Sequence, residues 1–211
     1  MFVTACPLVL ASASPRRQEL LRALGLHFTC KAAEIDERPL PEEASTNFAL
    51  RMAQAKAHAV AATEPPAACV IAADTVVAIE ETGGTGARIL GKPKDHAEAL
   101  DFLRLLNGRS HTVITGLALV APLRGLDLTC PVQSRVQFGR FEENVLAAYA
   151  AGPEPLDKAG AYAVQGAGAF LVETISGSAT NVIGLPMTEL ADMLLQHQLI
   201  APVADMGRIA G

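Results

Sequence analysis

One carboxylate lies in the middle of an apolar stretch, where a charge is costly. Asp74 stands inside Ile71-Ala72-Ala73-Asp74-Thr75-Val76-Val77, a β-branched and apolar run typical of a buried central strand. Burying a carboxylate there is unfavourable unless hydrogen bonds, a cation or a metal ion hold it. A core aspartate bonded to loop backbone is one interpretation. The pattern favours the other, in which Asp74 is a general base or a Mg²⁺ ligand.

Two arginines, Arg16 and Arg17, follow Ser14-Pro15 at the expected start of a helix. Ser14 is a suitable N-cap and Pro15 a suitable first helical residue. Arginines at this positive end of the helix dipole are unfavourable by about 0.3–1 kcal/mol each, unless an anion binds there. Backbone N–H groups and guanidinium groups both favour phosphate oxygens. Solvated surface arginines are the alternative, but a strand-to-helix turn is a common ligand site in α/β folds.

A lysine and a glutamine stand in two glycine-containing segments further along the chain. Gly86-x-x-x-x-Gly91-Lys92 matches most of a phosphate-binding Walker A motif, but Pro93 replaces the Ser or Thr that would bind Mg²⁺. Lys92 is therefore either a lone phosphate contact or a surface lysine. Small residues surround Gln165, whose amide offers the donor and acceptor needed to read a nucleobase edge. A glutamine that stabilises a turn is the alternative there.

These side chains together suit metal-assisted attack on a phosphate ester, although they do not identify the base. No Gly-x-Ser-x-Gly elbow is present, and no Gly-x-Gly-x-x-Gly follows an expected strand. Covalent serine catalysis and dinucleotide binding therefore have little support.

The elements that must position these residues alternate between strands and helices. We expect strands at residues 8–11, 69–79, 89–90, 111–120 and 132–138, with one or two more within 161–175 around Gln165-Gly166. We expect helices after Ser14 up to Gly25, from Ser45 or Thr46 to before Pro65-Pro66, and over 95–106, 142–150 and 186–198. The Gly-rich segment 81–86 is predicted to close a hairpin. The fold class is therefore α/β, with a mixed sheet rather than a purely parallel one.

The composition excludes several classes of protein. A chain of 211 residues with 50% hydrophobic and 18% charged residues can bury a core and is not a disordered tail. A formal net charge of −5 argues against a nucleic-acid or anionic-membrane surface. The 4 cysteines and 5 histidines show no zinc-type spacing, which is typical of free thiols in a reducing cytosol. Because the N-terminus lacks the basic residues of a signal peptide and no apolar run reaches about 18 residues, we expect a cytoplasmic protein.

A series of motifs runs along the chain from near residue 8 to near residue 198: Leu10-Ala11-Ser12-Ala13-Ser14-Pro15-Arg16-Arg17, Glu34 to Glu37, Ala73 to Val77, Gly91 to Pro93, Gly108 to His111, Asp157 to Gly166 and Val182 to Pro186. In these motifs and their order the chain resembles the Maf family of nucleotide pyrophosphatases. The resemblance implies an elongated mixed sheet flanked by helices, with the site in a cleft between two lobes. We expect one such domain over residues 1–200 and a frayed tail over 201–211.

The resemblance also implies a reaction and a set of roles. Water would attack the α-phosphorus of a nucleoside triphosphate and release pyrophosphate, with a divalent cation, Mg²⁺ or Mn²⁺, as cofactor. Asp74 would accept the proton, and Glu37 and Asp74 would bind the metal. Because the register of the Glu34, Asp36 and Glu37 loop is open, the exact metal ligand among these three acids is open too. The remaining phosphate-binding or metal-binding positions are Ser12, Arg16, Arg17, Lys56 and Lys92.

Three positions separate substrate classes in that family, and here they are Arg16, Thr75 and Gln165. Thr75 after the catalytic acid, together with Gln165, resembles the dTTP/UTP branch. The 7-methyl-GTP branch carries Gln and Glu there instead. A glutamine amide can pair with the imide edge of a pyrimidine, so we expect dTTP and UTP as substrates.

Two alternatives to this substrate reading stay open. One is a pyrophosphatase for 7-methyl-GTP or other modified nucleotides, and the other is a nucleotide-binding regulator of cell division. Many family members are dimers, so we expect a homodimer, and we expect neither a nucleic-acid nor a membrane partner.

Overall fold

The computed structural model describes residues 1–80 and 87–203, so the expected hairpin loop at 81–86 and most of the expected tail lie outside the described residues. The strands are β1 Phe2–Thr4, β2 Leu8–Leu10, β3 Thr29–Cys30, β4 Cys69–Glu80, β5 Ala87–Leu90, β6 Ser110–Ala121, β7 Leu126–Phe138, β8 Val172–Ser176 and β9 Ile200–Pro202. The α-helices are α1 Pro15–Ala23, α2 Ser45–Ala61, α3 His96–Leu106, α4 Glu143–Ala150, α5 Ala179–Ile183 and α6 Met187–Gln196. Four 3₁₀ turns complete the description: η1 Pro122–Arg124, η2 Glu154–Asp157, η3 Ala159–Ala161 and η4 Ala167–Leu171.

The main sheet has seven strands and is mixed, as the sequence predicts. Its order is β3-β2-β4-β6-β7-β8, with β5 paired to β4 off this path. β2 runs parallel to both β3 and β4, whereas β5 is antiparallel to β4 and β8 is antiparallel to β7. The return of β5 along β4 confirms the expected hairpin pairing. A second sheet joins β1 to β9 in antiparallel register, with Val3 opposite Ala201.

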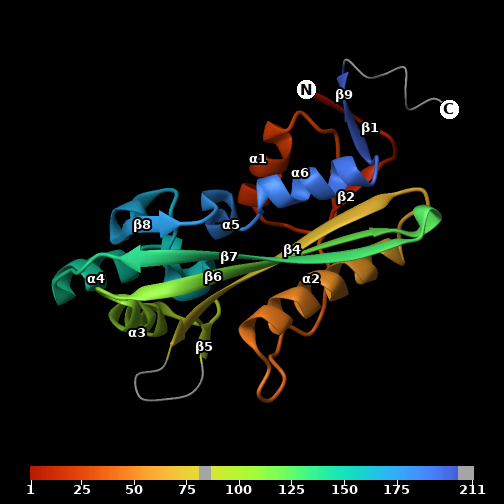
Figure 1. The fold of residues 1–211 in the computed structure, drawn as a ribbon. Helices are drawn as coiled ribbons and strands as arrows, with labels where there is room; N and C mark the ends of the chain where they lie inside the picture. The colour runs from red at the N-terminus through yellow and green to blue at the C-terminus, as the bar shows by residue number, and fades with distance from the viewer. Residues whose placement is uncertain (81–86, 204–211) are drawn as a thin grey trace. The chain divides into compact units, whose positions relative to one another are not determined.

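The chain divides into two compact units, of which the first comprises residues 1–74, 115–132 and those from 184 onward. Its strands β2 and β4 are buried on both faces over the residues that lie in this unit. Along β4, Cys69, Ile71 and Ala73 pack in one apolar cluster with residues of α1 and α6, while Val70 and Ala72 pack in another with α2. Figure 1 shows α2 on one side of these strands and α1 with α6 on the other. Burial on both faces explains why β4 reads as a continuous apolar run rather than an alternating one.

Helix α2 packs directly against the backbone of β6 within this first unit. A Cβ atom added to Gly116 would lie 2.4 Å from the carbonyl oxygen of Ala49, which is far inside van der Waals contact. Gly116 therefore lets the helix approach the strand closely. This contact sets the distance between α2 and the sheet, and α2 also carries Lys56 and Arg51.

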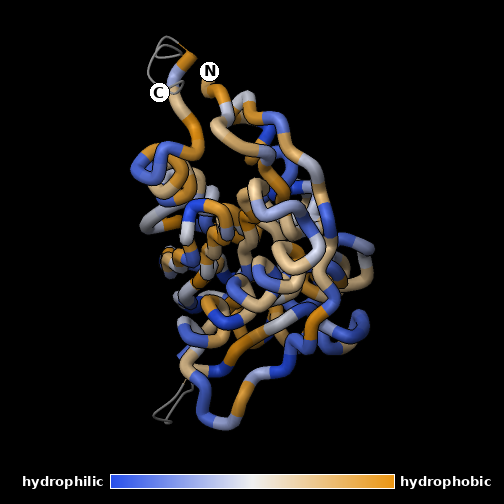
Figure 2. Tube along the Cα trace, turned by 90° about the vertical axis from the view of Figure 1, so that its right-hand side faces the viewer, coloured by the Kyte–Doolittle hydropathy of each residue, from blue (hydrophilic) through white to orange (hydrophobic). Residues whose placement is uncertain are grey.

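The second unit comprises residues 75–114 and 133–183 and has its own apolar core. Residues of α3 and α4 pack with strand residues in one cluster that includes Phe102, Leu106, Phe138 and Tyr149. Helix α3 begins as predicted, because the Asp95 side chain accepts a hydrogen bond of 2.8 Å from the backbone N–H of Glu98. Figure 2 shows apolar stretches in the interior of the trace and polar residues on its outer turns.

Of the one or two strands expected within residues 161–175, the structure confirms one, β8, but this strand begins at Val172 and none adjoins Gln165-Gly166. The segment bends there between η3 and η4, and only β8 within the expected range is a strand. Gly160 and Gly166 have φ angles of 70° and 95°, which lie in a region that strand residues do not adopt. The apolar residues nearby instead pack into the core of the second unit.

Strand β9 extends over Ala201 and Pro202, which are the first two residues of the segment that we expected to fray. The strand is held by its pairing with β1 at the other end of the chain. In the ranges 1–80 and 87–203, no helix combines the length and apolar character needed to cross a membrane.

Candidate active site

Two carboxylates share one ammonium group in the first unit. Lys56 Nζ on α2 lies 2.6 Å from Asp74 Oδ1 and 2.7 Å from Glu37 Oε1. The side chains of Lys56 and Asp74 are each only 13% exposed, so this pair is largely removed from water. The arrangement brings together three of the predicted site residues, which come from a loop, a helix and a strand.

The environment of Asp74 favours its protonated form. Burial raises the pKa of the Asp74 carboxyl above its usual range, and the nearby charge of Glu37 acts in the same direction. The hydrogen bond and positive charge of Lys56, with the charge of Arg17, oppose the rise in pKa without cancelling it. A carboxylate with a raised pKa is a stronger proton acceptor, which is what a general base requires.

The two arginines of the first helical turn have different surroundings. Arg17 Nε donates to the carbonyl of Gly184 at 2.8 Å, and its Nη1 approaches Ser12 Oγ at 3.5 Å. Burial lowers the pKa of Arg17, while the negative charge of Asp74 opposes this. Arg16 is partly exposed and, among the described residues, its side chain forms no ion pair. Arg17 thus joins α1 to the turn before α6, and Arg16 has its guanidinium group available for a ligand.

Ser14 precedes α1 as predicted but does not cap it with its side chain. Ser12 Oγ instead accepts a hydrogen bond of 3.1 Å from the backbone N–H of Ser14. The buried Ser12 hydroxyl therefore shapes the turn that leads into the helix and contacts Arg17 from the same position.

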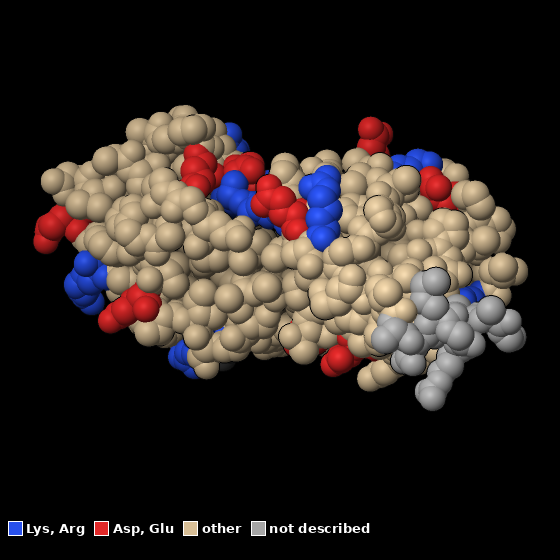
Figure 3. Space-filling view, turned by 90° about the horizontal axis from the view of Figure 1, so that it is seen from above, with Lys and Arg blue, Asp and Glu red and all other residues tan. Residues whose placement is uncertain are grey.

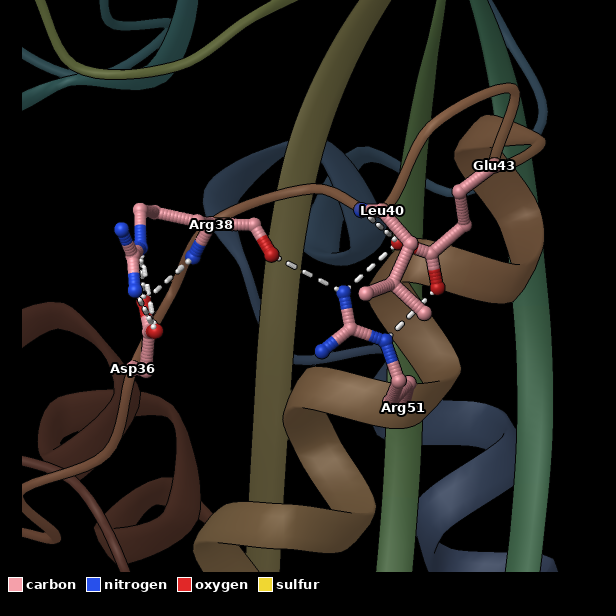
Figure 4. Close-up of polar contacts among 5 residues, drawn as sticks. All are labelled: Asp36, Arg38, Leu40, Glu43 and Arg51. Atoms are coloured by element: carbon pink, nitrogen blue, oxygen red, sulfur yellow. Dashed lines mark hydrogen bonds and ion pairs between the residues drawn. The ribbon is translucent and has the colours of Figure 1, made fainter.

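A network anchored on Arg51 fixes the loop that carries Glu37 (Figure 4). Arg51 Nη2 donates to the carbonyl of Arg38 at 3.1 Å and to Glu43 Oε2 at 2.6 Å. Glu43 Oε2 also accepts from the backbone N–H of Leu40 at 3.0 Å, so one carboxylate closes the loop on itself. The hydrogen bonds from Arg51 lower the pKa of Glu43 to about 2. The loop is thereby tied to α2, the helix that carries Lys56.

This network settles which acid of the loop faces Lys56. Asp36 forms an exposed pair with Arg38, at 2.6 Å between Oδ2 and Nη2. In the described part of the chain, Glu37 is the acid of the three that contacts Lys56. The sequence alone did not decide which of Glu34, Asp36 and Glu37 faces the site. It also did not identify Arg51 or Glu43, because residues eight apart across the start of a helix match no local sequence pattern.

The other predicted residues, Thr75, Lys92 and Gln165, lie in the second unit. Lys92 is exposed and lies two residues after the end of β5. The carbonyl of the preceding Gly91 accepts a hydrogen bond of 3.0 Å from the backbone N–H of Gly160, so the Lys92 loop is joined to the Lys158–Gly160 turn. Gln165 is exposed in the bend between η3 and η4.

The donor set of the first unit fits a hard divalent cation. Mg²⁺ usually takes one or two carboxylates from a protein, with substrate oxygens and water completing the shell. Glu37 and Asp74 supply two carboxylates within reach of one ammonium group. Residues 1–80 and 87–203 contain no cluster of three or more His, Cys, Asp or Glu side chains suited to a metal. Figure 3 shows acidic and basic side chains side by side on one face, most of which is otherwise uncharged.

Comparisons with known proteins extend over almost the whole chain. The chain is 48% identical to the dTTP/UTP pyrophosphatase of Myxococcus xanthus over 195 residues, covering 92% of this chain and 94% of that protein. It is 44% identical to the dTTP/UTP pyrophosphatase of Desulfotalea psychrophila over 195 residues, covering 92% and 96%. A Staphylococcus aureus Ham1 protein of solved structure aligns over 91% of this chain and 99% of its own, with 15% identity and a TM-score of 0.48. The family model described as Maf-like protein matches residues 7–197, and the chain therefore belongs to the Maf family.

Proposed function

We propose that this protein is a nucleoside triphosphate pyrophosphatase that hydrolyses dTTP and UTP to the nucleoside monophosphate and pyrophosphate. The observation that carries the proposal is the largely buried Asp74 carboxyl, whose pKa is raised by burial and which contacts Lys56 beside Glu37. Both relatives described above are named for this activity on dTTP and UTP.

Asp74 accepts a proton from the attacking water in this proposal. The water oxygen forms a bond to the α-phosphorus, and the bond from that phosphorus to the bridging oxygen of the β-phosphate breaks. Pyrophosphate leaves with the electron pair of that bond. Lys56 holds the Asp74 carboxylate in place at 2.6 Å, and its positive charge favours the ionised form that a base requires, against the opposing effect of burial.

Phosphate binding is assigned to arginines of the first unit and to one lysine of the second. A triphosphate spreads its negative charge over several oxygens, so catalysis depends mainly on the placement of positive groups. Arg16 presents a guanidinium group at the first turn of α1, where backbone N–H groups also favour an anion. Arg17 and Ser12 support that turn, and Lys92 is a further phosphate contact.

A divalent cation, Mg²⁺ or Mn²⁺, is the proposed cofactor, with Glu37 and Asp74 as its protein ligands. When bound, it would neutralise triphosphate oxygens and polarise the phosphorus. The proximity of the two carboxylates at Lys56 supports this assignment, and so does the fixed register of the Glu37 loop.

Thr75 and Gln165 are the proposed determinants of the base. The Gln165 amide is exposed, and it can donate to and accept from the imide edge of thymine or uracil. The proposal also includes a cytoplasmic location, which rests on the sequence features described above, and a homodimer, which rests on the family resemblance.

The test of this function is the product distribution from purified protein with Mg²⁺ or Mn²⁺. The protein is offered dTTP, UTP, CTP, 7-methyl-GTP, ITP and ATP, and pyrophosphate and orthophosphate are assayed separately. Monophosphate and pyrophosphate, formed fastest from dTTP and UTP, are the expected result. The same products led by 7-methyl-GTP or ITP would overturn the substrate assignment, and nucleotide binding without turnover would overturn the enzyme assignment.

The role of Gln165 is tested by replacing it with the residue of the 7-methyl-GTP branch. Gln165→Glu is expected to lower turnover of dTTP and UTP much more than it lowers the melting temperature. Unchanged activity on both substrates would remove Gln165 from base recognition.

A further inference from the structure

One carboxylate in the second unit accepts hydrogen bonds from the backbone that follows Gln165. Glu154 Oε2 accepts from the N–H of Gly168 at 2.7 Å, and Oε1 accepts from the N–H of Ala167 at 3.2 Å. The Tyr149 hydroxyl donates to the same Oε2 at 2.8 Å. Bonds to a charged acceptor are the stronger kind, so three of them on one carboxylate form a firm connection.

Glycines at positions 166 and 168 let the backbone of this turn lie close to the ends of the Glu154 and Tyr149 side chains. A Cβ atom on Gly166 would lie 2.2 Å from Glu154 Oε1, and one on Gly168 would lie 2.3 Å from the Tyr149 hydroxyl oxygen. Gly166 also has a φ angle of 95°, which L side chains rarely adopt. The Glu154 carboxylate thus hydrogen-bonds directly to the backbone of this turn, with no side chain of the turn between them.

The residues that precede Gln165 are held as well. The segment before the turn lies against the same glycine as the tyrosine, because a Cβ atom built at Gly168 would lie 2.9 Å from the Ala163 carbonyl oxygen and 2.3 Å from the Tyr149 hydroxyl oxygen. The Tyr162 hydroxyl lies 2.7 Å from His111 Nε2, in the buried core. The exposed Gln165 therefore lies between two anchored stretches of backbone.

We infer that Glu154, acting with Tyr149, is a positioning residue for substrate selection, because it fixes the direction in which the turn presents the Gln165 amide. This inference rests on the proposed function. A preorganised amide favours the one base edge that matches it, whereas an amide on a loose turn must be ordered at the expense of binding energy. Loosening the turn is thus expected to weaken selection of the base and to leave the chemical step, which belongs to Asp74, unchanged.

The first measurement compares Glu154→Ala with the unaltered protein on dTTP and CTP. Loss of hydrogen bonds to a charged group should raise the KM for dTTP about tenfold, with kcat within about threefold. The preference in kcat/KM for dTTP over CTP should fall with it. Glu154→Gln, which keeps one acceptor oxygen, should lie between the two, and Tyr149→Phe should act in the same direction. Glu143→Ala removes an exposed acid of the same unit that pairs with Arg104, and it should change neither constant.

A double-mutant cycle separates positioning of Gln165 from general support of the fold. If Glu154 acts through Gln165, then Glu154→Ala should change the dTTP preference little once Gln165→Ala is present. The inference would be overturned if Glu154→Ala lowered the dTTP preference equally in the unaltered protein and in Gln165→Ala. It would also be overturned if Glu154→Ala alone left the dTTP preference unchanged. If Glu154→Ala does not fold, as judged by its melting curve, the same comparison is made with Glu154→Gln and Tyr149→Phe. Failure of the unaltered protein to release pyrophosphate from any nucleotide would instead overturn the proposed function.

Discussion

The two compact units place their candidate functional groups on different kinds of structure. In the first unit, Asp74 and Lys56 lie on a strand and a helix, and charged side chains contact one another at 2.6 Å. In the second unit, Gln165 lies in a glycine-containing bend whose backbone is held by the Glu154 carboxylate. Proton transfer and charge stabilisation need side chains at fixed distances, which helices and strands supply. Recognition of a nucleobase by Gln165 instead needs a backbone turn of a particular shape. The division suggests that substitutions in the first unit act mainly on kcat and those in the second on KM and selectivity.

The largest effect is expected from Asp74→Asn, which preserves shape but removes the proton acceptor. Loss of a general base should lower kcat about a thousandfold for every nucleotide, with KM changed little. Asp127→Asn is the matched control, because Asp127 also bonds to α2, through Gln54 and His58, but lies outside the Lys56 cluster. Steady-state rates of pyrophosphate release measure both. A comparable loss of kcat in the two variants would contradict the role of Asp74.

Glu37→Gln and Asp36→Asn sharpen the account of the first unit, since the two acids are neighbours with different partners. Glu37→Gln should raise the Mg²⁺ concentration for half-maximal rate about tenfold to a hundredfold, as expected for loss of a group at a metal site. Asp36→Asn should leave this concentration nearly unchanged, because Asp36 pairs with Arg38 in the loop. Titration of the rate with Mg²⁺ distinguishes them, and a larger shift for Asp36→Asn would show that the register of the loop is assigned wrongly.

Gly116→Ala tests whether the close approach of α2 positions the charged cluster. The added methyl group would meet the Ala49 carbonyl and should lower the free energy of unfolding by about 2–3 kcal/mol. Gly91→Ala is the control for stability, because within residues 1–80 and 87–203 no heavy atom beyond the two chain neighbours lies within 4 Å of a Cβ built at Gly91. Denaturant unfolding measures both variants. Equal stability of the two would show that the helix shifts away without strain.

His111 offers a test of the second unit, because the side chain is 3% exposed and burial lowers its pKa to about 4. The unfolded chain takes up a proton at this residue near pH 6.5, whereas the folded chain does so only near pH 4. Stability from neutral His111 is thus present above pH 6.5 and is lost as the pH falls toward 4. The free energy of unfolding should drop on the order of 2 kcal/mol between pH 7 and pH 5 from this residue.

His111→Gln should reduce this pH dependence and keep a partner for Tyr162. His27→Gln, at an exposed position, should retain the full dependence. Denaturant unfolding at a series of pH values measures the slopes. Identical slopes in the unaltered protein and His111→Gln would contradict the assignment to His111.

The parts of the fold that local sequence determines were predictable. The apolar run of β4, the Asp95 cap of α3 and the return of β5 all follow from residue type and spacing. The pairing of β1 with β9 was not predictable, because it joins the two ends of the chain and neither strand has a strong pattern alone. Strand β8 was predicted within 161–175, but the bend next to Gln165 was not, because the apolar residues there are typical of a strand and do not reveal the positive φ angles of Gly160 and Gly166.

The candidate site shows the same limit. The buried position of Asp74 marked it as unusual from its apolar neighbours alone. The choice of Glu37 over Asp36 depended on Lys56 and on the Arg51 network, which are distant in sequence and meet only in the folded chain. The support of the Gln165 turn by Glu154 had no sequence signal, since an acid eleven residues earlier matches no local motif.

The most direct test of the division between the two units is one set of steady-state measurements on two variants. kcat and KM are determined for Asp74→Asn and Gln165→Glu with dTTP, UTP, CTP and 7-methyl-GTP. Asp74→Asn is predicted to lower kcat for all four by the same factor and to leave their order unchanged. Gln165→Glu is predicted to reduce kcat/KM for dTTP and UTP selectively. If Asp74→Asn changes the order of substrates, or if Gln165→Glu lowers kcat equally for all four, chemistry and base selection are not divided between the two units.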